Sequence, residues 1–256
     1  RRSTAPAGGV GLKGKRISRG RNVPRPVRGS RSPANGSEPR LSRASVGRLS
    51  LYLRRLEGLL REGSSKVSSR QLAESLALTD AQVRKDLAYL GSLGHPGIGY
   101  PTQELIAAIR RTLGIDRQWA VALVGVGNLA RALLRYRSFQ QQGFHIVALF
   151  DVDPGKVGQR LEGLEIHSLE QLPEAIAATK AELGIVTVPA DAAQGVADAL
   201  VAAGIRGILN FAPAVLRLPP NVSLVAVDLA IQLEQLAFLV QLHGGAIQRV
   251  TRYPVV

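Results

Sequence analysis

The C-terminal part of the chain alternates short apolar runs with longer amphipathic segments, and this alternation constrains the fold more than any other feature. The apolar runs occupy residues 120–124, 145–150, 185–188, 208–210 and 224–227, and helical patterns occupy residues 129–137, 169–178 and 192–203. Continuous Val, Ile and Leu runs between helices indicate a parallel sheet that is covered on both faces. The sequence therefore predicts an α/β domain over residues 119–227.

A glycine-containing turn directly follows the first apolar run, and it reads Gly125-Val126-Gly127-Asn128-Leu129-Ala130. The first glycine permits a tight turn, the second lets the backbone approach a pyrophosphate, and the small Ala130 lets the helix pack closely on the strand. The next strand ends at Asp151, whose carboxylate suits the ribose hydroxyls of NAD and repels the 2′-phosphate of NADP. This context predicts a Rossmann-type site for NADH or NAD+.

Neutral side chains follow the other predicted strands at the same end of the sheet. Besides Asp151, the residues that we expect to contact the cofactor beyond the turn are Val152, Thr187, Val188, Pro189, Asn210, Phe211 and Ala212. They suit a pocket wall better than proton transfer. None of the four histidines, His95, His145, His167 and His243, stands at the end of a late strand, where hydride transfer would need a general acid or base. We therefore predict a binding site without catalytic residues, and not an enzyme.

The positive charge is confined to the N-terminal part. Residues 1–40 hold 11 Lys and Arg against one Glu, residues 41–100 hold nine against five acids, and residues 101–256 hold 13 against 13. A basic N-terminal part on a neutral body favours a polyanionic partner, most simply nucleic acid. For residues 1–40 alone a solvated tail is an equal alternative, and their Gly, Pro, Ser and Arg content predicts disorder.

Residues 41–100 carry the pattern of three helices and a hairpin. Apolar residues from Val46 to Leu60 recur at helical spacing until Gly63. Capping-box pairs, Ser68 with Gln71 and Thr79 with Gln82, predict the starts of the second and third helices. The glycine-rich residues 91–99 suit a hairpin, which completes a winged helix. Thr102 is then expected to cap a connecting helix that ends at Gly114.

The third of these helices has the chemistry of a DNA-reading helix. Its stripe of Val83, Leu87 and Leu90 is predicted to face a small core, which leaves a polar face outward. Gln reads adenine, and Arg and Lys read guanine or hold phosphate, so this face suits a major groove. The residues that we expect to contact DNA are Arg48, Ser69, Gln82, Arg84, Lys85, Tyr89, Gly97, Gly99 and Tyr100.

Residues 229–242 form a helical segment that is apolar on nearly every side. Such a helix is buried on more than one side. It is either a core helix of the same subunit or, as we prefer for an element near the end of the chain, a helix that packs against a second subunit.

Composition excludes several other classes. The absence of Cys excludes disulfides, thiolate zinc sites and Cys nucleophiles, and it suits a reducing compartment. No apolar run reaches the ~20 residues that a membrane-spanning helix requires. We therefore expect a soluble cytoplasmic protein without a metal or a membrane partner.

Five motifs together resemble the Rex family of redox-sensing repressors, over about residues 42–242. They are Tyr52-Leu53-Arg54, Gln82-Val83-Arg84-Lys85-Asp86-Leu87, Gly97-Ile98-Gly99-Tyr100, Phe150-Asp151-Val152-Asp153-Pro154 and Gly207-Ile208-Leu209-Asn210-Phe211-Ala212-Pro213. The resemblance implies a homodimer with an N-terminal winged-helix domain, a Rossmann-type parallel-sheet domain and a C-terminal helix swapped between subunits. The expected organisation is a disordered basic tail (1–40), winged helix (41–100), connecting helix (101–118), Rossmann domain (119–227), dimerisation helix (228–243) and tail (244–256).

The resemblance also implies a mechanism. The apo or NAD+-bound dimer would sit on a palindromic double-stranded operator, and NADH would release it. Arg54, Tyr136 and Asp228 would link the state of the cofactor to the position of the DNA-binding domain. The sequence departs from the family pattern at Pro96, where a basic wing residue is common, and at Leu229, where an aromatic residue often follows the Asp.

Two other functional classes remain open at this point. The first is an enzyme, either an NAD-dependent oxidoreductase or a CoA-binding ligase subunit with a basic N-terminal extension. The second is a non-enzymatic scaffold that uses the fold for interaction and binds no nucleotide. NADH turnover with a small substrate would favour the enzyme, whereas a complete lack of nucleotide binding would favour the scaffold.

Overall fold

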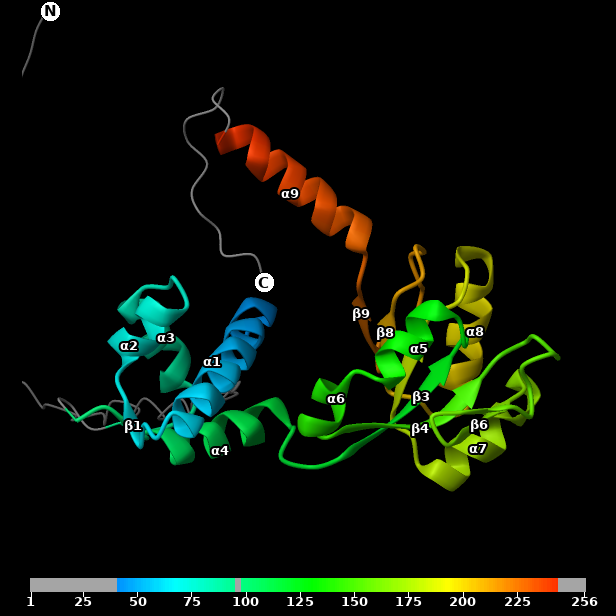
Figure 1. Ribbon diagram of the computed structural model, residues 1–256, viewed down its shortest axis with the longest axis horizontal. Helices are drawn as coiled ribbons and strands as arrows, with labels where there is room; N and C mark the ends of the chain where they lie inside the picture. The colour runs from blue at the N-terminus through cyan, green and yellow to red at the C-terminus, as the bar shows by residue number, and fades with distance from the viewer. Residues whose placement is uncertain (1–40, 95–97, 244–256) are drawn as a thin grey trace, which may run out of the picture. The chain divides into compact units, whose positions relative to one another are not determined.

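The structure, a computed structural model, describes residues 41–94 and 98–243 (Figure 1). The predicted tails at residues 1–40 and 244–256 therefore lie outside the described residues. So do His95, Pro96 and Gly97 of the predicted hairpin.

The N-terminal part of the described chain is a small helical unit around one core. It contains α1 (Arg43–Arg61), β1 (Lys66–Val67), α2 (Ser69–Ser75), α3 (Asp80–Ala88), β2 (Tyr100–Pro101) and α4 (Thr102–Leu113). The predicted stripe on α3 is confirmed, because Val83 and Leu87 are buried in this core and Leu90 packs against it. Leu105 and Ile109 of α4 lie in the same core, so this helix does more than connect two domains.

Helix caps in this unit follow the prediction in part. The capping box of Ser68 and Gln71 is complete, with both reciprocal bonds formed. Thr79 accepts a bond from the Gln82 backbone N–H at 3.2 Å, but the predicted return bond from the Gln82 side chain is wrong. In a capping box the Gln82 side-chain oxygen would accept from the Thr79 N–H; here the side chain is held on Asp86 instead, to which its amide nitrogen donates at 3.0 Å.

The hairpin prediction is corrected by the pairing of β2. This strand pairs antiparallel with β1, which lies between α1 and α2, and not with a strand inside the glycine-rich stretch. Gly99 has a φ of +83°, and a Cβ there would lie 2.6 Å from the carbonyl oxygen of Val67. Glycine at this position therefore permits the close approach that the pairing needs.

The prediction that Thr102 caps α4 is also wrong. Pro101 occupies the cap position, and no side chain makes the cap bond. Thr102 is the first helical residue and is fully buried, and its hydroxyl has no partner within the described part of the chain. The helix ends at Gly114 as predicted, with a left-handed φ of 67°.

The second part is a seven-stranded sheet in the order β5-β6-β4-β3-β7-β8-β9. Its strands are β3 (Trp119–Val124), β4 (Phe144–Phe150), β5 (Arg160–Leu161), β6 (Leu164–His167), β7 (Leu183–Val186), β8 (Gly207–Asn210) and β9 (Ser223–Ala226). All neighbouring strands are parallel except β5 and β6. The predicted parallel sheet is thus confirmed. The sequence analysis did not predict the β5–β6 hairpin, which turns at Glu162 and Gly163, both with positive φ.

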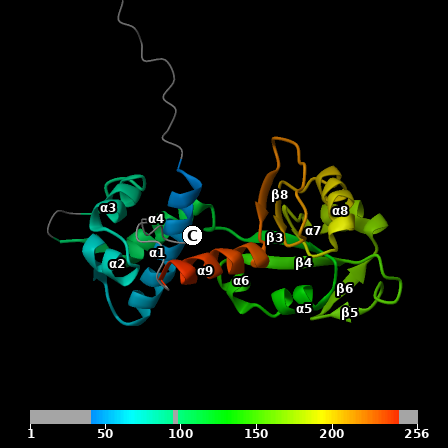
Figure 2. The ribbon, with the colours of Figure 1, turned by 90° about the horizontal axis from the view of Figure 1, so that it is seen from above.

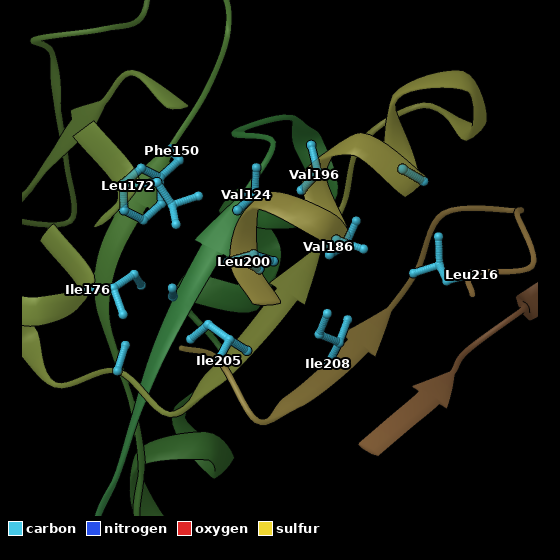
Figure 3. Close-up of a cluster of buried hydrophobic side chains, with 14 of the residues drawn as sticks. Val124, Phe150, Leu172, Ile176, Val186, Val196, Leu200, Ile205, Ile208 and Leu216 are labelled. Carbon is cyan, nitrogen blue, oxygen red and sulfur yellow. The ribbon is translucent and has the colours of Figure 1, made fainter. Parts of the chain in front are cut away.

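Helices cover both faces of the sheet (Figure 2). Alternate residues of each strand pack against opposite layers. On one face Val124, Phe150 and Val186 pack against α7 (Leu172–Thr179) and α8 (Ala190–Ala202), as Figure 3 shows. On the other face Leu123 and Ile185 pack against α5 (Asn128–Leu134) and α6 (Arg137–Gln141). A short 3-10 helix, Leu169–Gln171, precedes α7. Burial on both faces explains why the strands are apolar without alternation.

One helix was predicted over residues 129–137, and the structure divides it. Helix α5 ends at Leu134, and Tyr136 adopts a non-helical backbone with a ψ of 89° before α6 begins. The Tyr136 ring contacts the Phe139 ring edge to face, with centroids 5.2 Å apart. The apolar spacing runs across the break, so local periodicity does not reveal it.

The final helix, α9 (Leu229–His243), is orange to red in Figure 1. Leu229, Leu233, Leu236, Phe238 and Val240 are each more than half exposed. The alternative of a core helix in the same subunit is therefore wrong. Within the described ranges, none of the helices combines the length and the apolar character needed to cross a membrane.

Candidate nucleotide-binding and nucleic-acid-binding sites

The register of the sheet brings the predicted cofactor residues to one edge. Phe150, Val124, Val186, Asn210 and Ala226 form a single row across β4, β3, β7, β8 and β9. The residues that follow them therefore all emerge at the carboxyl ends of parallel strands. In open α/β sheets ligands bind in the crevice at this edge.

Gly125 makes the sharpest turn at this edge. Its φ is +93°, and a Cβ would lie 2.8 Å from the carbonyl oxygen of Thr187 and 2.7 Å from Cγ1 of Val188. The Thr187 hydroxyl donates to the carbonyl oxygens of Val124 and Gly125, at 3.0 and 2.7 Å. The turn is thus pressed against the end of β7, and only glycine fits there.

Gly127 differs from Gly125 in both backbone and surroundings. Its φ is −94°, which other residues adopt readily, and a Cβ would meet nothing within 4 Å. Asn128 and Leu129 beside it are exposed, whereas Val126 and Ala130 are buried. The second glycine therefore leaves open space above the start of α5, on the side where a pyrophosphate would approach.

Asp151 is buried, and its carboxylate is already engaged by three donors of this chain. Oδ2 accepts from the Val126 backbone N–H at 2.7 Å and from Lys156 Nζ at 3.0 Å, and Oδ1 accepts from the Asp153 backbone N–H at 2.9 Å. Burial alone would raise the pKa of Asp151, but these bonds outweigh it and hold the pKa below the ordinary value. Asp151 thus fixes the glycine turn, and the free acceptor capacity of Oδ1 is what remains for a ribose.

The later strand ends supply the walls of the site. Thr187, Val188 and Phe211 are half-buried, and Val152 and Pro189 are exposed. The buried Asn210 turns back on its own loop, where its amide donates to the carbonyl oxygens of Ala212 and Ala214 and accepts from the Ala212 N–H. It shapes this loop, and its side chain has little capacity left for a ligand.

The three residues expected to couple the sites have distinct surroundings. Asp228 is the N-terminal cap of α9, since its carboxylate accepts from the backbone N–H groups of Ala230 and Ile231, at 2.9 and 3.3 Å. Tyr136 is exposed at the break between α5 and α6, and Arg54 is exposed on α1. Their coupling role stays a prediction.

The predicted DNA-reading face divides into free and engaged side chains. Lys85 and Tyr89 are exposed on α3, and Arg84 is exposed but pairs with Asp80 at 2.7 Å. Ser69 and Tyr100 are half-buried near the start of α2 and on β2. The exposed cations offer a surface for phosphates.

Arg48 and Gln82 are instead tied to Asp86, a residue that the sequence analysis did not assign a role. Arg48 donates to both Asp86 oxygens through Nε and Nη2, at 2.6 and 2.8 Å, so its guanidinium is held in place and its predicted contact with DNA stays a prediction. Asp86 lies three residues after Val83, on the buried side of the helix, and this spacing was the signal that could have revealed it. Lys156, five residues after Asp151, was missed in the same way.

Electrostatics favours a charged Asp86. Burial alone would raise its pKa, but the bonds from Arg48, Tyr52 and Gln82 outweigh it and lower the pKa. Burial and the Asp86 carboxylate both raise the pKa of Tyr52, so its hydroxyl stays a donor.

Among the described residues, no three His, Asp or Glu side chains are grouped so that they could hold a metal ion.

Comparison with known proteins extends these observations. A family model described as "CoA binding domain" matches residues 116–214, and one described as "Putative DNA-binding protein N-terminus" matches residues 40–88. The redox-sensing transcriptional repressor Rex of Rhodopirellula baltica is 47% identical over 201 residues, which are 78% of this chain and 85% of that protein.

Two solved structures of a Rex-family repressor called RSP are also similar. RSP in complex with β-NAD+ and operator DNA has 36% identity and a TM-score of 0.76, and the match covers 80% of this chain and 94% of that one. RSP in complex with β-NADH has 35% identity and a TM-score of 0.72, and the match covers 80% and 96%. The similarity thus extends beyond either family model alone.

Proposed function

The chain belongs to the Rex family of redox-sensing transcriptional repressors, and we propose that it binds palindromic operator DNA as a homodimer and leaves it when NADH binds its Rossmann domain. The observation that carries the proposal is the edge where Gly125, Asp151 and Thr187 meet, on the same chain as a helix that exposes Arg84 and Lys85.

NADH and NAD+ are the proposed ligands of this edge. The turn held by Asp151 leaves open space at Gly127, which suits the close approach of a pyrophosphate. The neutral residues Thr187, Val188 and Phe211 would line the nicotinamide. The oxidised ring is cationic and the reduced ring is uncharged, so a lining by these neutral side chains would favour the reduced form.

Operator DNA is the proposed ligand of α3 and its neighbours. The exposed Lys85, Arg84 and Tyr89 support phosphate and base contacts, and the N-terminal part carries the excess of positive charge. We assign Gly97 and Gly99 to the same surface on the family resemblance, with Gly97 outside the described residues.

The proposed dimer is held by α9. Its apolar side chains are exposed all round the helix, and β9 is an edge strand with Val225 more than half exposed. A contiguous apolar surface of this kind marks an interaction site. Beside β9 the sheet has a cavity whose lining includes the half-buried Ile146 and Leu209 and the exposed Val225, so we propose that each subunit receives the α9 of its partner.

Coupling between the ligands is proposed to pass through α9. Asp228 caps this helix two residues after β9 ends. A ligand bound at the carboxyl ends of the strands would therefore lie within a few residues of the start of α9. If NADH weakens operator binding by some factor, operator DNA must weaken NADH binding by the same factor. Tyr136 and Arg54 are proposed to complete this link.

We further propose that the protein is not an enzyme and acts in the cytoplasm. At this edge His167 ends β6 in register with Phe150, and the centroids of the two rings lie 5.9 Å apart. The carboxylates of Asp151 and Asp228 accept hydrogen bonds from backbone N–H groups, so both are already engaged, which supports binding without proton transfer. The CoA family match covers the nucleotide fold only, which makes CoA the natural competitor to test.

The test is a titration of a palindromic duplex, selected in vitro with the full chain, followed by fluorescence anisotropy at fixed salt. NADH should weaken binding by at least about tenfold, within the usual range of allosteric coupling, while NAD+ and CoA leave it unchanged. A scrambled duplex of equal length controls for charge. Undiminished operator binding at saturating NADH would contradict the proposal, and steady NADH consumption with a small carbonyl substrate would favour the oxidoreductase alternative.

A further inference from the structure

A single buried carboxylate lies beneath the DNA-reading helix. The Asp86 side chain is 1% exposed, and four hydrogen bonds from three residues surround it. Arg48 Nε and Tyr52 Oη donate to Oδ2 at 2.6 and 2.8 Å, while Arg48 Nη2 and Gln82 Nε2 donate to Oδ1 at 2.8 and 3.0 Å. A carboxylate has about four acceptor positions, so this one is filled by the chain itself.

We infer that Asp86 is a positioning residue for sequence readout, which orients Gln82 toward the base edges and locks α3 against α1 through Arg48 and Tyr52. The inference rests on the proposed DNA-binding function and names what sets its specificity. Asp86 itself is too buried to touch DNA, so it acts through its partners.

The orientation of Gln82 follows from the chemistry of the acceptor. An ionised carboxylate only accepts hydrogen bonds, so the amide nitrogen of Gln82 must face Asp86 and the amide oxygen must lie on the other side. The nitrogen keeps one free N–H. Gln82 therefore presents an oxygen acceptor and an N–H donor, the pair that reads N6 and N7 of adenine.

Arg48 and Tyr52 hold the other side of the carboxylate. Both lie on α1, 38 and 34 residues before Asp86, so their bonds join the two helices. The Arg48 fork binds both oxygens at once and leaves the carboxylate little freedom to rotate. Asp86 is thereby fixed from α1, and Gln82 is fixed from Asp86.

This arrangement separates sequence readout from general affinity. Lys85 and Arg84 lie on the exposed side of α3 and make no bond to Asp86. Contacts of such cations with phosphates carry no sequence information. Loss of the Asp86 charge should therefore affect discrimination between DNA sequences more than binding to any duplex.

The experiment compares Asp86→Asn with the wild type and with Glu74→Gln, all as full chains. Glu74 is an exposed carboxylate of α2 that pairs with the exposed Arg70, so its variant makes the same change of charge in the same unit. Anisotropy at fixed salt measures the affinity for the selected palindrome and for its scrambled counterpart. Circular dichroism and NADH fluorescence report the fold and the nucleotide site separately.

Asp86→Asn should lower the ratio of palindrome to scrambled affinity by about tenfold, the size of one base contact, and should leave scrambled binding within about twofold. Glu74→Gln should keep the wild-type ratio. An asparagine both donates and accepts, so it permits either orientation of Gln82. In vitro selection with Asp86→Asn should accordingly return a weaker preference for adenine. In a Gln82→Ala background, the same substitution should change that preference no further.

The outcomes distinguish this inference from the function on which it rests. A wild type that prefers no sequence would overturn the proposed function. A folded Asp86→Asn variant with the wild-type ratio would overturn the inference and leave the proposed function intact. If the Asp86→Asn variant fails to fold, Tyr52→Phe tests the inference in its place, because this substitution removes one donor to Asp86 and keeps both bonds from Arg48. Its ratio should fall by about threefold, a fraction of one contact, and an unchanged ratio would overturn the inference.

Discussion

Replacing Gly125 with alanine should strongly destabilise the sheet domain, because the added Cβ brings two independent energetic costs. The first is backbone strain at a φ of +93°, which costs a residue with a Cβ roughly 1–2 kcal/mol. The second is a collision, since the Cβ would lie 2.8 Å from Thr187 O and 2.7 Å from Val188 Cγ1. Overpacking of this kind costs about 1–3 kcal/mol.

The free energy of unfolding should therefore fall by about 2–5 kcal/mol, a large fraction of the stability of a typical domain. With a urea slope of about 2 kcal/mol per molar, the midpoint moves down by roughly 1–2.5 M. Trp119 is the one tryptophan of the chain, and it lies on β3 with its indole N–H bound to the Gly114 carbonyl oxygen at 2.7 Å. Its fluorescence reports the unfolding of this domain.

Gly127→Ala is the matched control, two residues along the same turn. Its φ of −94° suits alanine, and a Cβ there meets nothing within 4 Å. The free energy of unfolding should stay within the ~0.5 kcal/mol typical of neutral changes, which is a midpoint shift of at most about 0.25 M at the same slope. NADH affinity should fall, because the methyl group occupies the approach of the pyrophosphate. Equal midpoints for Gly125→Ala and the wild type would refute the reasoning, as would equal losses of stability in the two variants.

Three further changes test other parts of the structure. The pKa of Asp151 in the folded protein lies below the unfolded value of about 3.9, so the ionised carboxylate stabilises the fold above that pH, and this stabilisation is lost as the pH falls through the folded pKa. Urea midpoints followed by Trp119 fluorescence should therefore drop more steeply below about pH 4 in the wild type than in Asp151→Asn. The double variant Leu233→Glu/Leu236→Glu should be a monomer by light scattering. Both leucines are more than half exposed in the single chain, and each would contribute about 1.5–3 kcal/mol when the partner subunit buries it. A dimer of wild-type stability would exclude α9 from the interface. Lys156→Gln removes the cation 3.0 Å from Asp151, so fluorescence titration should show a larger loss of affinity for NADPH than for NADH, and equal losses would count against Asp151 as the ribose ligand.

Much of the architecture could be predicted from local pattern. The apolar runs predicted the parallel strands, and the capping box at Ser68 and the glycine at 114 marked helix ends that the structure has. The stripe of Val83 and Leu87 likewise identified the buried face of α3. Each of these features depends on residues within a few positions of one another, which is why the sequence alone contains them.

The candidate sites were predictable only in their composition. The sequence placed Gly125, Gly127 and Asp151 at one sheet edge, because parallel strands end together. It did not reveal that Asp151 already accepts three bonds, or that Asn210 turns back on its own loop. The partners that satisfy a buried polar group are chosen by packing, and residue type alone does not name them.

The amino-acid sequence by itself determined the helices, the strands and the two kinds of chemistry, since periodicity and glycine placement act over short stretches of chain. Only the tertiary structure decided which polar groups meet. Asp86 shows the reason most directly: its strongest partner, Arg48, is 38 residues away, and two helices must pack before a carboxylate on one can be neutralised by a guanidinium on the other.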